Sequence, residues 1–507
     1  MKNLLIGLHG YGHDSNFSLY DMRTGQIRYY KFERRVGIKH YDAHSLVNWI
    51  RIELPYLGYD IDNVLEICTT LGAIVPWFHH DAENTVKQIL SPLNVCTLNH
   101  HQAHQYSNFT ETGLVCDYAG NNDECLSIYG YDKCNLKLTN TNHPSLGWIY
   151  LEAYQNFYEG CHNYLENGFW ETLLNQSDYA GKVMAWDAYG HYMPDWHTQN
   201  KDLTLRDIHE WSNMNNMNLS SYEDRFIQHA TYIKNVTLKY SQEIISLCKN
   251  FFAVNDYFSY SGGVAQNLVL NNFLKSTFPN IEIIPHNQDE GLSLGCLYHL
   301  LKKYEIDTTQ VRLDNFPFSQ SDQDMGYASS KTIKKVAEYL ANGKIVLWCQ
   351  GHGEIGPRAL GNRSILMNPL IKDAKEQINK KVKKREWYRP YGASVKFDKY
   401  KKYFNLDWES PYMLYQSNVI DKDSFKSICH ADGTCRIQTV YPKQETFYNL
   451  LDEFEKLTGV PVLLNTSCNL PGKPIVGFEN QVFDMFNNCE ADYLIIGDRQ
   501  YERNNND

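Results

Sequence analysis

Short apolar segments of strand length alternate with longer segments of helical spacing along this chain, and this alternation constrains its fold most. In the C-terminal part the expected strands are 344–348, 394–397, 435–440 and 460–465, and the expected helices are 331–342, 372–383 and 445–459. Alternation of this kind is typical of α/β domains, in which helices cover the faces of a sheet. We therefore expect an α/β fold.

The N-terminal part contains more turns. Strands are expected at 4–8, 16–20, 114–117 and 125–129, and helical spacing at 45–68, 83–93 and over most of 145–255. A stretch without any clear period, 314–330, carries proline, glycine and several serines and is the expected linker. Because 507 residues are too many for one core, we expect two domains, residues 1–325 and 326–507.

Composition excludes several classes of protein. Hydrophobic residues make up 43% of the chain and charged residues 21%, which fits a globular protein. No apolar run is long enough to span a membrane, so we expect no membrane partner. The net charge of −11 disfavours broad binding to duplex nucleic acid and leaves room for a local basic groove. Thirteen cysteines without CxxC pairs favour reduced thiols in the cytoplasm.

A turn-rich segment after the expected strand 344–348 carries Arg358 and Arg363 among Gly356, Pro357 and Gly361. Glycines let backbone N–H groups approach an anion, and guanidinium forks bind phosphate in a bidentate manner. A structural turn with surface arginines is the alternative.

Residues 372–389 hold eight Lys or Arg against three acidic residues. A solvated basic helix is the usual origin of such a run. The alternative is a pocket for a polyanion, which needs a cluster of cations.

Two histidines, His100 and His104, lie four residues apart, so that on a helix both face one side and can share a metal ion. His101 would point elsewhere. Asp117 ends an apolar strand and Asp289 opens a helix, and two His with two Asp suit Fe(II), Mn(II), Co(II) or Zn(II). Solvated histidines and capping or turn aspartates are the alternatives, and the residues alone leave open whether the four converge.

Two further turns carry polar groups. Gly262 and Gly263 follow a strand and open a helix near Asn267, where backbone N–H groups can bind phosphate or ribose. His13, beside Asp14 at the first turn, has the ordinary pKa of a general base for an alcohol. A turn histidine, with the aspartate capping the backbone, is the alternative.

Several ordered motifs together resemble the O-carbamoyltransferases that decorate antibiotics and nodulation factors. They are the HHxxH segment and the strings SGGVAQN, DEG, GPRALGNRSIL, KKREWYRPYGAS, DGTCRIQT and NTSCNLPGKPIV. The resemblance implies an N-terminal actin/sugar-kinase-like ATPase domain, related to the tRNA threonylcarbamoyl transferases, and a C-terminal YrdC-like domain. The chain departs from the family at Tyr118, where a glycine is usual, and at Asn121, where a glutamate would fall.

The resemblance also implies the chemistry. The C-terminal domain would make carbamoyladenylate from carbamoyl phosphate and ATP, with Mg, and the N-terminal domain would transfer the carbamoyl group to a hydroxyl of a small molecule or nucleoside. The implied residues that bind carbamoyl phosphate and ATP are Arg358, Arg363, Lys383, Arg389, Arg436, Ser467 and Asn469. Arg358 and Lys383 would be catalytic, as would His13 with Asp14. The implied metal ligands are His100, His104, Asp117 and Asp289, with Fe(II) favoured, and the implied nucleotide-binding residues are Gly262, Gly263 and Asn267.

Three other readings stay open. One is carbamoylation of a hydroxymethylated pyrimidine base in a nucleotide or nucleic acid. Another is a sugar-kinase-like ATPase without carbamoyl chemistry, which would not need the basic C-terminal residues. The third is a non-catalytic nucleotide-binding scaffold. A homodimer is compatible with each reading.

Overall fold

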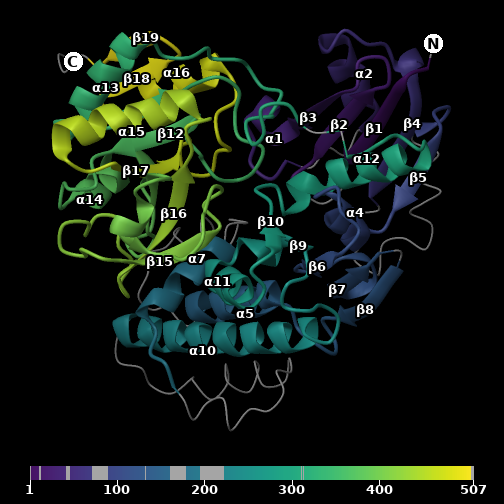
Figure 1. Cartoon of the computed structure of the whole chain (residues 1–507), viewed down its shortest axis with the longest axis horizontal. Coiled ribbons are helices and arrows are strands. Elements are labelled where there is room, and N and C mark those ends of the chain that lie inside the picture. Colours follow the sequence, from purple (N-terminus) through teal and green to yellow (C-terminus); the bar gives the residue numbers. More distant parts are fainter. Residues whose placement is uncertain are drawn as a thin grey trace. The chain divides into compact units, whose positions relative to one another are not determined.

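A computed structural model of the chain describes residues 2–10, 13–41, 46–70, 90–131, 133–159, 179–193, 222–309, 311 and 313–503 (Figure 1). Strands and helices alternate in it, which confirms the α/β class. The chain divides into two compact units. The first comprises residues 1–69, 87–96 and 296–507, and the second comprises residues 70–86 and 97–295. The expected helix at 83–93 lies almost entirely outside the described residues.

The first sheet has the strand order β3-β2-β1-β4-β5. Its strands are β1 (Leu4–His9), β2 (Asn16–Asp21), β3 (Gln26–Lys31), β4 (Val64–Thr70) and β5 (Val95–Leu98). The first three form an antiparallel meander, and β4 runs parallel to β1. Two helices, α1 (Phe32–Val36) and α2 (Leu46–Tyr56), lie between β3 and β4 in the chain. The helix expected over 45–68 therefore ends early, because 64–70 is a buried strand.

The second sheet repeats this order as β8-β7-β6-β9-β10. Its strands are β6 (Gly113–Cys116), β7 (Glu124–Gly130), β8 (Lys133–Thr139), β9 (Phe258–Ser261) and β10 (Ile281–Ile283). Again three antiparallel strands come first, and β9 runs parallel to β6. The helices are α4 (His100–Tyr106), α5 (Leu146–Glu159), α7 (Tyr179–Trp186), α10 (Tyr222–Cys248), α11 (Leu268–Thr277) and α12 (Leu292–Lys303).

Aromatic side chains fill the space between α5, α7 and α10. The ring of Trp186 lies 5.0 Å from that of Phe157 and 5.9 Å from that of Phe226, both edge-on. Edge-to-face contacts at these distances favour a fixed packing of large rings. The described part of 145–255 is thus helical, as its spacing predicted.

A mixed sheet of nine strands, in the order β14-β15-β16-β13-β17-β12-β11-β18-β19, forms the rest of the first unit. Its strands are β11 (Val346–Cys349), β12 (Arg363–Met367), β13 (Gly392–Lys396), β14 (Phe404–Asn405), β15 (Tyr415–Val419), β16 (Thr434–Val440), β17 (Val462–Ser467), β18 (Tyr493–Ile496) and β19 (Arg499–Glu502). Its helices are α13 (Ser330–Ala341), α14 (Ala374–Ile378), α15 (Glu445–Thr458) and α16 (Glu479–Asn487).

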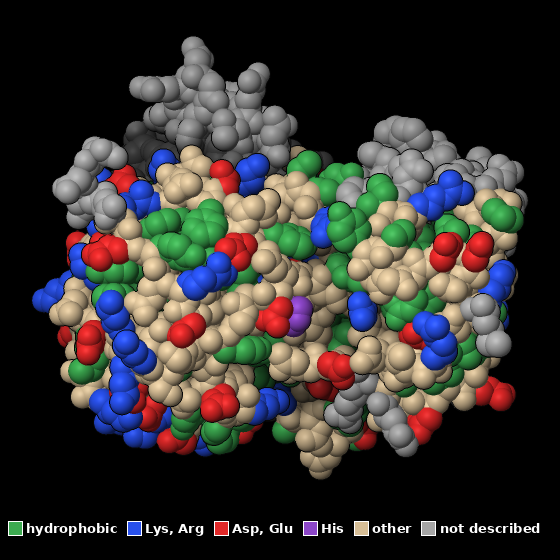
Figure 2. Space-filling model, turned by 90° about the horizontal axis from the view of Figure 1, so that it is seen from above, with side chains coloured by type: hydrophobic (Ala, Val, Ile, Leu, Met, Phe, Trp, Pro, Cys, Tyr) green, Lys and Arg blue, Asp and Glu red, His purple; other side chains and the backbone are tan. Residues whose placement is uncertain are grey.

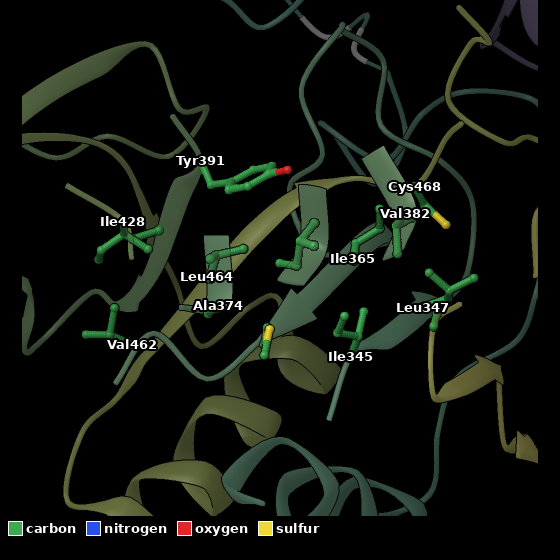
Figure 3. Packing of buried hydrophobic residues seen from close by; sticks show 14 of the residues in the cluster. Ile345, Leu347, Ile365, Ala374, Val382, Tyr391, Ile428, Val462, Leu464 and Cys468 are labelled. Atoms are coloured by element: carbon green, nitrogen blue, oxygen red, sulfur yellow. The ribbon is translucent and has the colours of Figure 1, made fainter. Parts of the chain in front are cut away.

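Apolar side chains cover both faces of this sheet. On one face, α13 and α15 contribute the side chains of Val336, Leu340, Leu450 and Phe454 to a buried cluster. On the other, strand residues such as Leu347, Ile365 and Leu464 pack with Val382 and Tyr391 (Figure 3). This core fixes the ends of β12, β13, β16 and β17, where the polar motifs lie.

The expected linker, 314–330, is packed within the first unit. Gln320 and Asp322 are buried, and a single β-bridge joins Gln320 to Tyr29. Arg34 donates a hydrogen bond to the Gly356 carbonyl (3.1 Å) and accepts one at its own carbonyl from Gln481 (2.7 Å). These contacts bind the N-terminal segment to the C-terminal sheet. The expected domain boundary at 325/326 stays a proposal.

Among the described residues, no helix is both long enough and apolar enough to cross a membrane. On the face shown in Figure 2, basic and acidic side chains are mixed over most of the described surface.

Candidate functional site

Two imidazoles meet at the start of α4. Asn99 caps this helix by accepting a hydrogen bond from the Gln102 N–H (3.1 Å), and the Asn121 side chain accepts one from the His100 N–H (2.7 Å). One helical turn separates His100 from His104, so their Nε2 atoms lie only 3.2 Å apart. Both histidines are buried.

The two aspartates complete this cluster. Asp117 follows β6, and its Oδ2 lies 3.0 Å from His100 Nε2 and 3.3 Å from His104 Nε2. Asp289 opens the turn before α12, and its Oδ1 lies 3.6 and 3.3 Å from the same two atoms. One ligand atom from each of the four residues lies within 4.8 Å of all the others. The set of two imidazoles and two carboxylates fits a divalent transition metal such as Fe(II) or Mn(II).

Electrostatics in this cluster favour a positive charge at its centre. Burial lowers the pKa of His104, but hydrogen bonds and attraction from Asp117 and Asp289 outweigh it and raise the pKa to about 9. Burial raises the pKa of Asp117, and its hydrogen bonds to His100 and His104 outweigh this and hold it well below the ordinary value. Two buried carboxylates are costly unless a cation compensates them, and a metal ion would do so better than a shared proton.

His101 takes no part in the cluster. Its Nδ1 lies 2.8 Å from the Ser127 hydroxyl, and burial lowers its pKa to about 3. It is a neutral packing residue, as expected from its place on the helix.

The double-glycine turn supports one of the metal ligands. The Gly263 N–H donates to Asp117 Oδ1 (2.9 Å), and the Gly262 N–H donates to the Asn287 carbonyl (2.7 Å). Gly262 has a φ of +92°, and a Cβ there would lie 2.1 Å from the Cys116 carbonyl oxygen. The turn therefore holds the Asp117 carboxylate in place.

Asn267 caps α11 by accepting from the Leu270 N–H (3.0 Å) and donates to the Tyr150 hydroxyl (2.8 Å). The hydrogen bonds of Asn267, Gly262 and Gly263 to other residues of the protein stabilise this turn. The nucleotide-binding role of all three residues stays a proposal.

A second cluster surrounds Asp14 in the first unit. The buried carboxylate has its Oδ2 2.8 Å from His13 Nδ1 and 2.8 Å from His40 Nδ1, and its Oδ1 3.2 Å from Lys31 Nζ. Burial raises the pKa of Asp14, but Lys31, His40 and His13 outweigh this and hold it well below the ordinary value. The side chain of His13 is 58% exposed. An exposed imidazole oriented by a buried carboxylate is suited to take a proton from a hydroxyl.

Lys383 brings together three residues of the C-terminal motifs. Its buried Nζ donates to the carbonyl of Ser467 (2.7 Å) and to the carbonyl and side-chain oxygens of Asn469 (2.9 and 2.7 Å). Burial, followed by repulsion from Arg385, holds the pKa of Lys383 well below its ordinary value. The Lys383 ammonium thus lies beside other cations.

Arginines surround this lysine. Burial and then repulsion from Arg358 and Arg389 hold the pKa of Arg436 well below its ordinary value, and its Nε–H has no hydrogen-bond partner among the described residues. Burial also lowers the pKa of Arg385 to about 10. Buried cations that repel one another are stabilised by a bound polyanion such as phosphate. We call Arg358, Lys383, Arg385, Arg389 and Arg436 the cation cluster.

Arg363 has a different set of partners. Its buried guanidinium donates to the carbonyls of Gln350 (2.5 Å), Gly351 (3.0 Å) and Gln323 (2.9 Å), and to Asp322 Oδ2 (3.3 Å). In this arrangement it braces the loop that follows β11.

Sequence reasoning missed several residues near these sites. Asn121, noted only as a departure from the family, positions His100. Arg385 stood in the basic run without being singled out. His430 lies near Arg436 and Lys375, and burial lowers its pKa to about 4. Nothing in the sequence around His430 indicated this environment.

Comparison with known proteins shows similarity to carbamoyltransferases. Residues 337–503 match the family model "Carbamoyltransferase C-terminus". The nodulation protein NolNO of Sinorhizobium fredii is 27% identical over 80% of this chain and 64% of that protein. The 3'-hydroxymethylcephem-O-carbamoyltransferases of Streptomyces clavuligerus and Amycolatopsis lactamdurans are 38% and 32% identical, over 45% and 48% of this chain and 44% and 48% of those proteins.

The chain thus spans about half to two thirds of the length of these curated relatives. Among solved structures, full-length HypF in its phosphate- and nucleotide-bound form has a TM-score of 0.34 at 14% identity, covering 60% of this chain and 56% of that one. This level of similarity assigns no fold. The C-terminal third of the chain thus matches the C-terminal domain of carbamoyltransferases, and longer stretches of it are similar to a nodulation protein and to hydroxymethylcephem O-carbamoyltransferases.

Proposed function

We propose that the protein is an ATP-dependent O-carbamoyltransferase that works in two steps. In the first, water releases phosphate from carbamoyl phosphate, the carbamate oxygen attacks the α-phosphorus of ATP, and pyrophosphate leaves. In the second, an acceptor hydroxyl attacks the carbonyl of the carbamoyladenylate, and AMP leaves. The cation cluster is the observation that carries this proposal, because two phosphorylated substrates must be held together against their mutual repulsion.

Roles in the first step follow from the contacts. Arg358, Arg389 and Arg436 would bind the phosphate groups, since repulsion from Arg358 and Arg389 lowers the pKa of Arg436 and a bound anion would offset it. Lys383 is held by Ser467 and Asn469 and would lie against the carbamoyl phosphate. Arg363 would act by bracing the loop that carries Arg358. ATP would enter with Mg²⁺, as phosphoryl substrates usually do.

His13 would accept the proton of the acceptor hydroxyl in the second step. Asp14 orients this imidazole through Nδ1, and Nε2 would take the proton of the hydroxyl. His100, His104, Asp117 and Asp289 would hold a divalent ion, with Fe(II) favoured, and this ion would stabilise negative charge on nucleotide phosphate. Gly262, Gly263 and Asn267 would complete the nucleotide site from the adjoining turn.

The repeated strand order supports the proposed fold of the N-terminal part. Two sheets with the same order and the same antiparallel start are what a duplicated actin/sugar-kinase-like ATPase domain requires. For the C-terminal part we propose a YrdC-like domain, supported by the motifs that carry Lys383, Arg389 and Arg436.

The acceptor we propose is a small-molecule or nucleoside hydroxyl. Support comes from relatives whose name specifies a hydroxymethyl acceptor. A hydroxymethyl group presents an unhindered primary alcohol, which the exposed imidazole of His13 could reach.

The first test follows AMP and pyrophosphate by chromatography after incubation with ATP, carbamoyl phosphate and Mn(II) or Fe(II). Release of pyrophosphate should require carbamoyl phosphate. Arg358→Ala should abolish carbamoyladenylate formation, whereas Arg499→Ala, which changes an exposed arginine paired with Glu479, should not. ATP turnover that is indifferent to carbamoyl phosphate would instead support the ATPase reading.

The second test separates the two steps. His13→Ala should still form carbamoyladenylate and should fail to carbamoylate an acceptor, because it lacks only the base. His191→Ala, at an exposed histidine, is the matched control. Loss of the first step in His13→Ala would refute the role assigned to His13.

A further inference from the structure

Two cysteines and a histidine converge on one face of the first sheet, apart from the residues discussed above. One ligand atom each from Cys68, Cys96 and His299 lies within 4.8 Å of the other two. Cys68 is buried in β4, Cys96 lies half-buried in the neighbouring strand β5, and His299 lies half-buried in α12. Figure 1 shows α12 beside β4 and β5.

Strand and helix periodicity explain this convergence. Residues two apart on β4 share a face, so Glu66 and Cys68 point the same way. That face is the one α12 covers, because Lys303 Nζ donates to Glu66 Oε1 at 2.6 Å. On α12, Cys296, His299 and Lys303 follow the spacing i, i+3, i+7 and form one stripe. The stripe therefore lies directly over the thiols.

The side chains of the two cysteines and the histidine also form hydrogen bonds with one another. Cys68 forms a hydrogen bond with Cys296 and another with Cys96, and Cys96 forms one with His299. All three groups belong to the first unit, and every described cysteine is a free thiol. Sulfur and nitrogen donors gathered in this way are available to a cation.

We propose that Cys68, Cys96 and His299 bind a thiophilic divalent cation, Zn²⁺ in the first instance. Two thiolates and an imidazole are a common ligand set for zinc, whereas carboxylate-rich sites suit harder ions. The fourth position falls to Cys296, which already contacts Cys68, or to water. The half-buried Cys96 and His299 let an ion enter from the surface without unfolding of β4.

The ion would have a structural role. It would join β5 and α12 to the central strand β4, three elements that are far apart in the sequence. Binding of an ion to the folded state alone raises stability by mass action. This site offers thiolates and an imidazole, whereas the cluster of His100, His104, Asp117 and Asp289 offers imidazoles and carboxylates. The two sites would therefore prefer different metals.

Cobalt(II) distinguishes the two sites, because only a site with cysteine ligands gives thiolate-to-cobalt charge-transfer absorption. Reduced, metal-free protein titrated with Co(II) should show this absorption, and Zn(II) should then displace it. Cys96→Ser should reduce the absorption to background. Cys429→Ser, at a half-buried cysteine elsewhere in the first unit, should leave it unchanged.

His299→Gln provides a second variant on the half-buried side of the site. It should keep the thiolate absorption and weaken Co(II) binding by roughly tenfold to a hundredfold. Cys296→Ser should change the absorption spectrum if Cys296 is the fourth ligand, and should leave it unchanged if water is. Circular dichroism shows whether each variant is folded.

Three outcomes would overturn the proposal. The first is a reduced wild-type protein without thiolate-to-cobalt absorption. Undiminished absorption in folded Cys96→Ser is the second. The third is a disulfide between Cys68 and Cys96 or Cys296 in protein purified without reductant, detected by peptide mass spectrometry, together with failure to bind Zn(II) after reduction. None of these readouts depends on catalytic activity.

Discussion

A buried guanidinium is costly unless its N–H groups meet acceptors. The two terminal nitrogens of Arg363 donate to four carbonyls and to Asp322, whereas its Nε–H has no partner among the described residues. Arg363→Met leaves these acceptors unpaired in the interior. We expect a loss of about 3 kcal/mol in the free energy of unfolding, measured by urea titration. Arg499→Met removes an exposed pair with Glu479 and should cost about 1 kcal/mol or less. Equal costs would mean that Arg363 does not brace its loop.

Gly262 occupies a position where any side chain would clash with the backbone. In Gly262→Ala the Cβ collides with the Cys116 carbonyl oxygen, next to Asp117, in a backbone conformation that alanine rarely adopts. We expect the free energy of unfolding to fall by roughly 3 kcal/mol. Metal binding should weaken as well, since the Asp117 carboxylate would move. Metal affinity can be measured by Mn(II) titration.

Gly58→Ala is the matched control for this substitution. Gly58 also has a positive φ, +80°, but a Cβ there meets nothing within 4 Å. Gly58→Ala should lower the free energy of unfolding by only about 1–2 kcal/mol and leave metal binding unchanged. Identical metal affinities in the two variants would show that the turn does not position Asp117.

Single residues also show what a sequence can and cannot reveal. The spacing of His100 and His104 predicts a shared helix face directly, because the period of a helix is fixed. Their meeting with Asp117 and Asp289 depends on long-range packing, and only the resemblance to a family indicated it. Residue type does not report burial, so the sequence could not show that the Arg363 guanidinium is buried and bonded to backbone carbonyls, and the anion-binding roles of Arg358 and Arg363 stay predictions.

At the scale of elements, α10 carries a pH-sensitive contact. Its His229 lies among aromatic rings, including Phe157 and Trp186, and burial lowers its pKa to about 4. The unfolded chain takes up a proton below about pH 6.5, whereas the folded chain does so only near pH 4, so stability falls as pH falls through this window.

His229→Phe should remove this dependence while keeping an aromatic side chain. Between neutral pH and about pH 5, the free energy of unfolding of the wild-type protein should fall by about 2 kcal/mol more than that of the variant. Urea titrations at the two pH values measure the difference. His191→Gln, at an exposed histidine, should behave as the wild type does. A wild-type-like slope in His229→Phe would contradict the assignment.

Elements were predicted well where a strong period coincided with burial. The antiparallel pair β6 and β7 and the amphipathic helices α13 and α15 were expected close to their observed bounds. The expected helix over 45–68 failed beyond Tyr56, because the spacing of apolar residues in 64–70 fits a buried strand as well as a helix. Polar composition at 314–330 suggested a linker, but hydrogen bonds there satisfy buried polar groups.

For the whole molecule, the two units should respond to different ligands. His100, His104, Asp117 and Asp289 all belong to the second unit, whereas the cation cluster belongs to the first. In calorimetry we expect two unfolding transitions, with Mn(II) raising the temperature of one and carbamoyl phosphate raising that of the other. A ligand at a hundred times its Kd adds about 2.7 kcal/mol to its own unit. One transition that shifts equally with both ligands would contradict this assignment.

The first unit joins residues 1–69 to residues 296–507, and Arg34 is held there by Gly356 and Gln481. The order of synthesis gives this arrangement a consequence. The N-terminal segment leaves the ribosome long before residues 296–507, with which it packs, have been synthesised. Its strands therefore stay without these packing partners, whereas the intervening residues 97–295 can already fold as a unit. Nascent chains halted before residue 296 should therefore carry an exposed first sheet, which makes this segment a natural client for chaperones during translation.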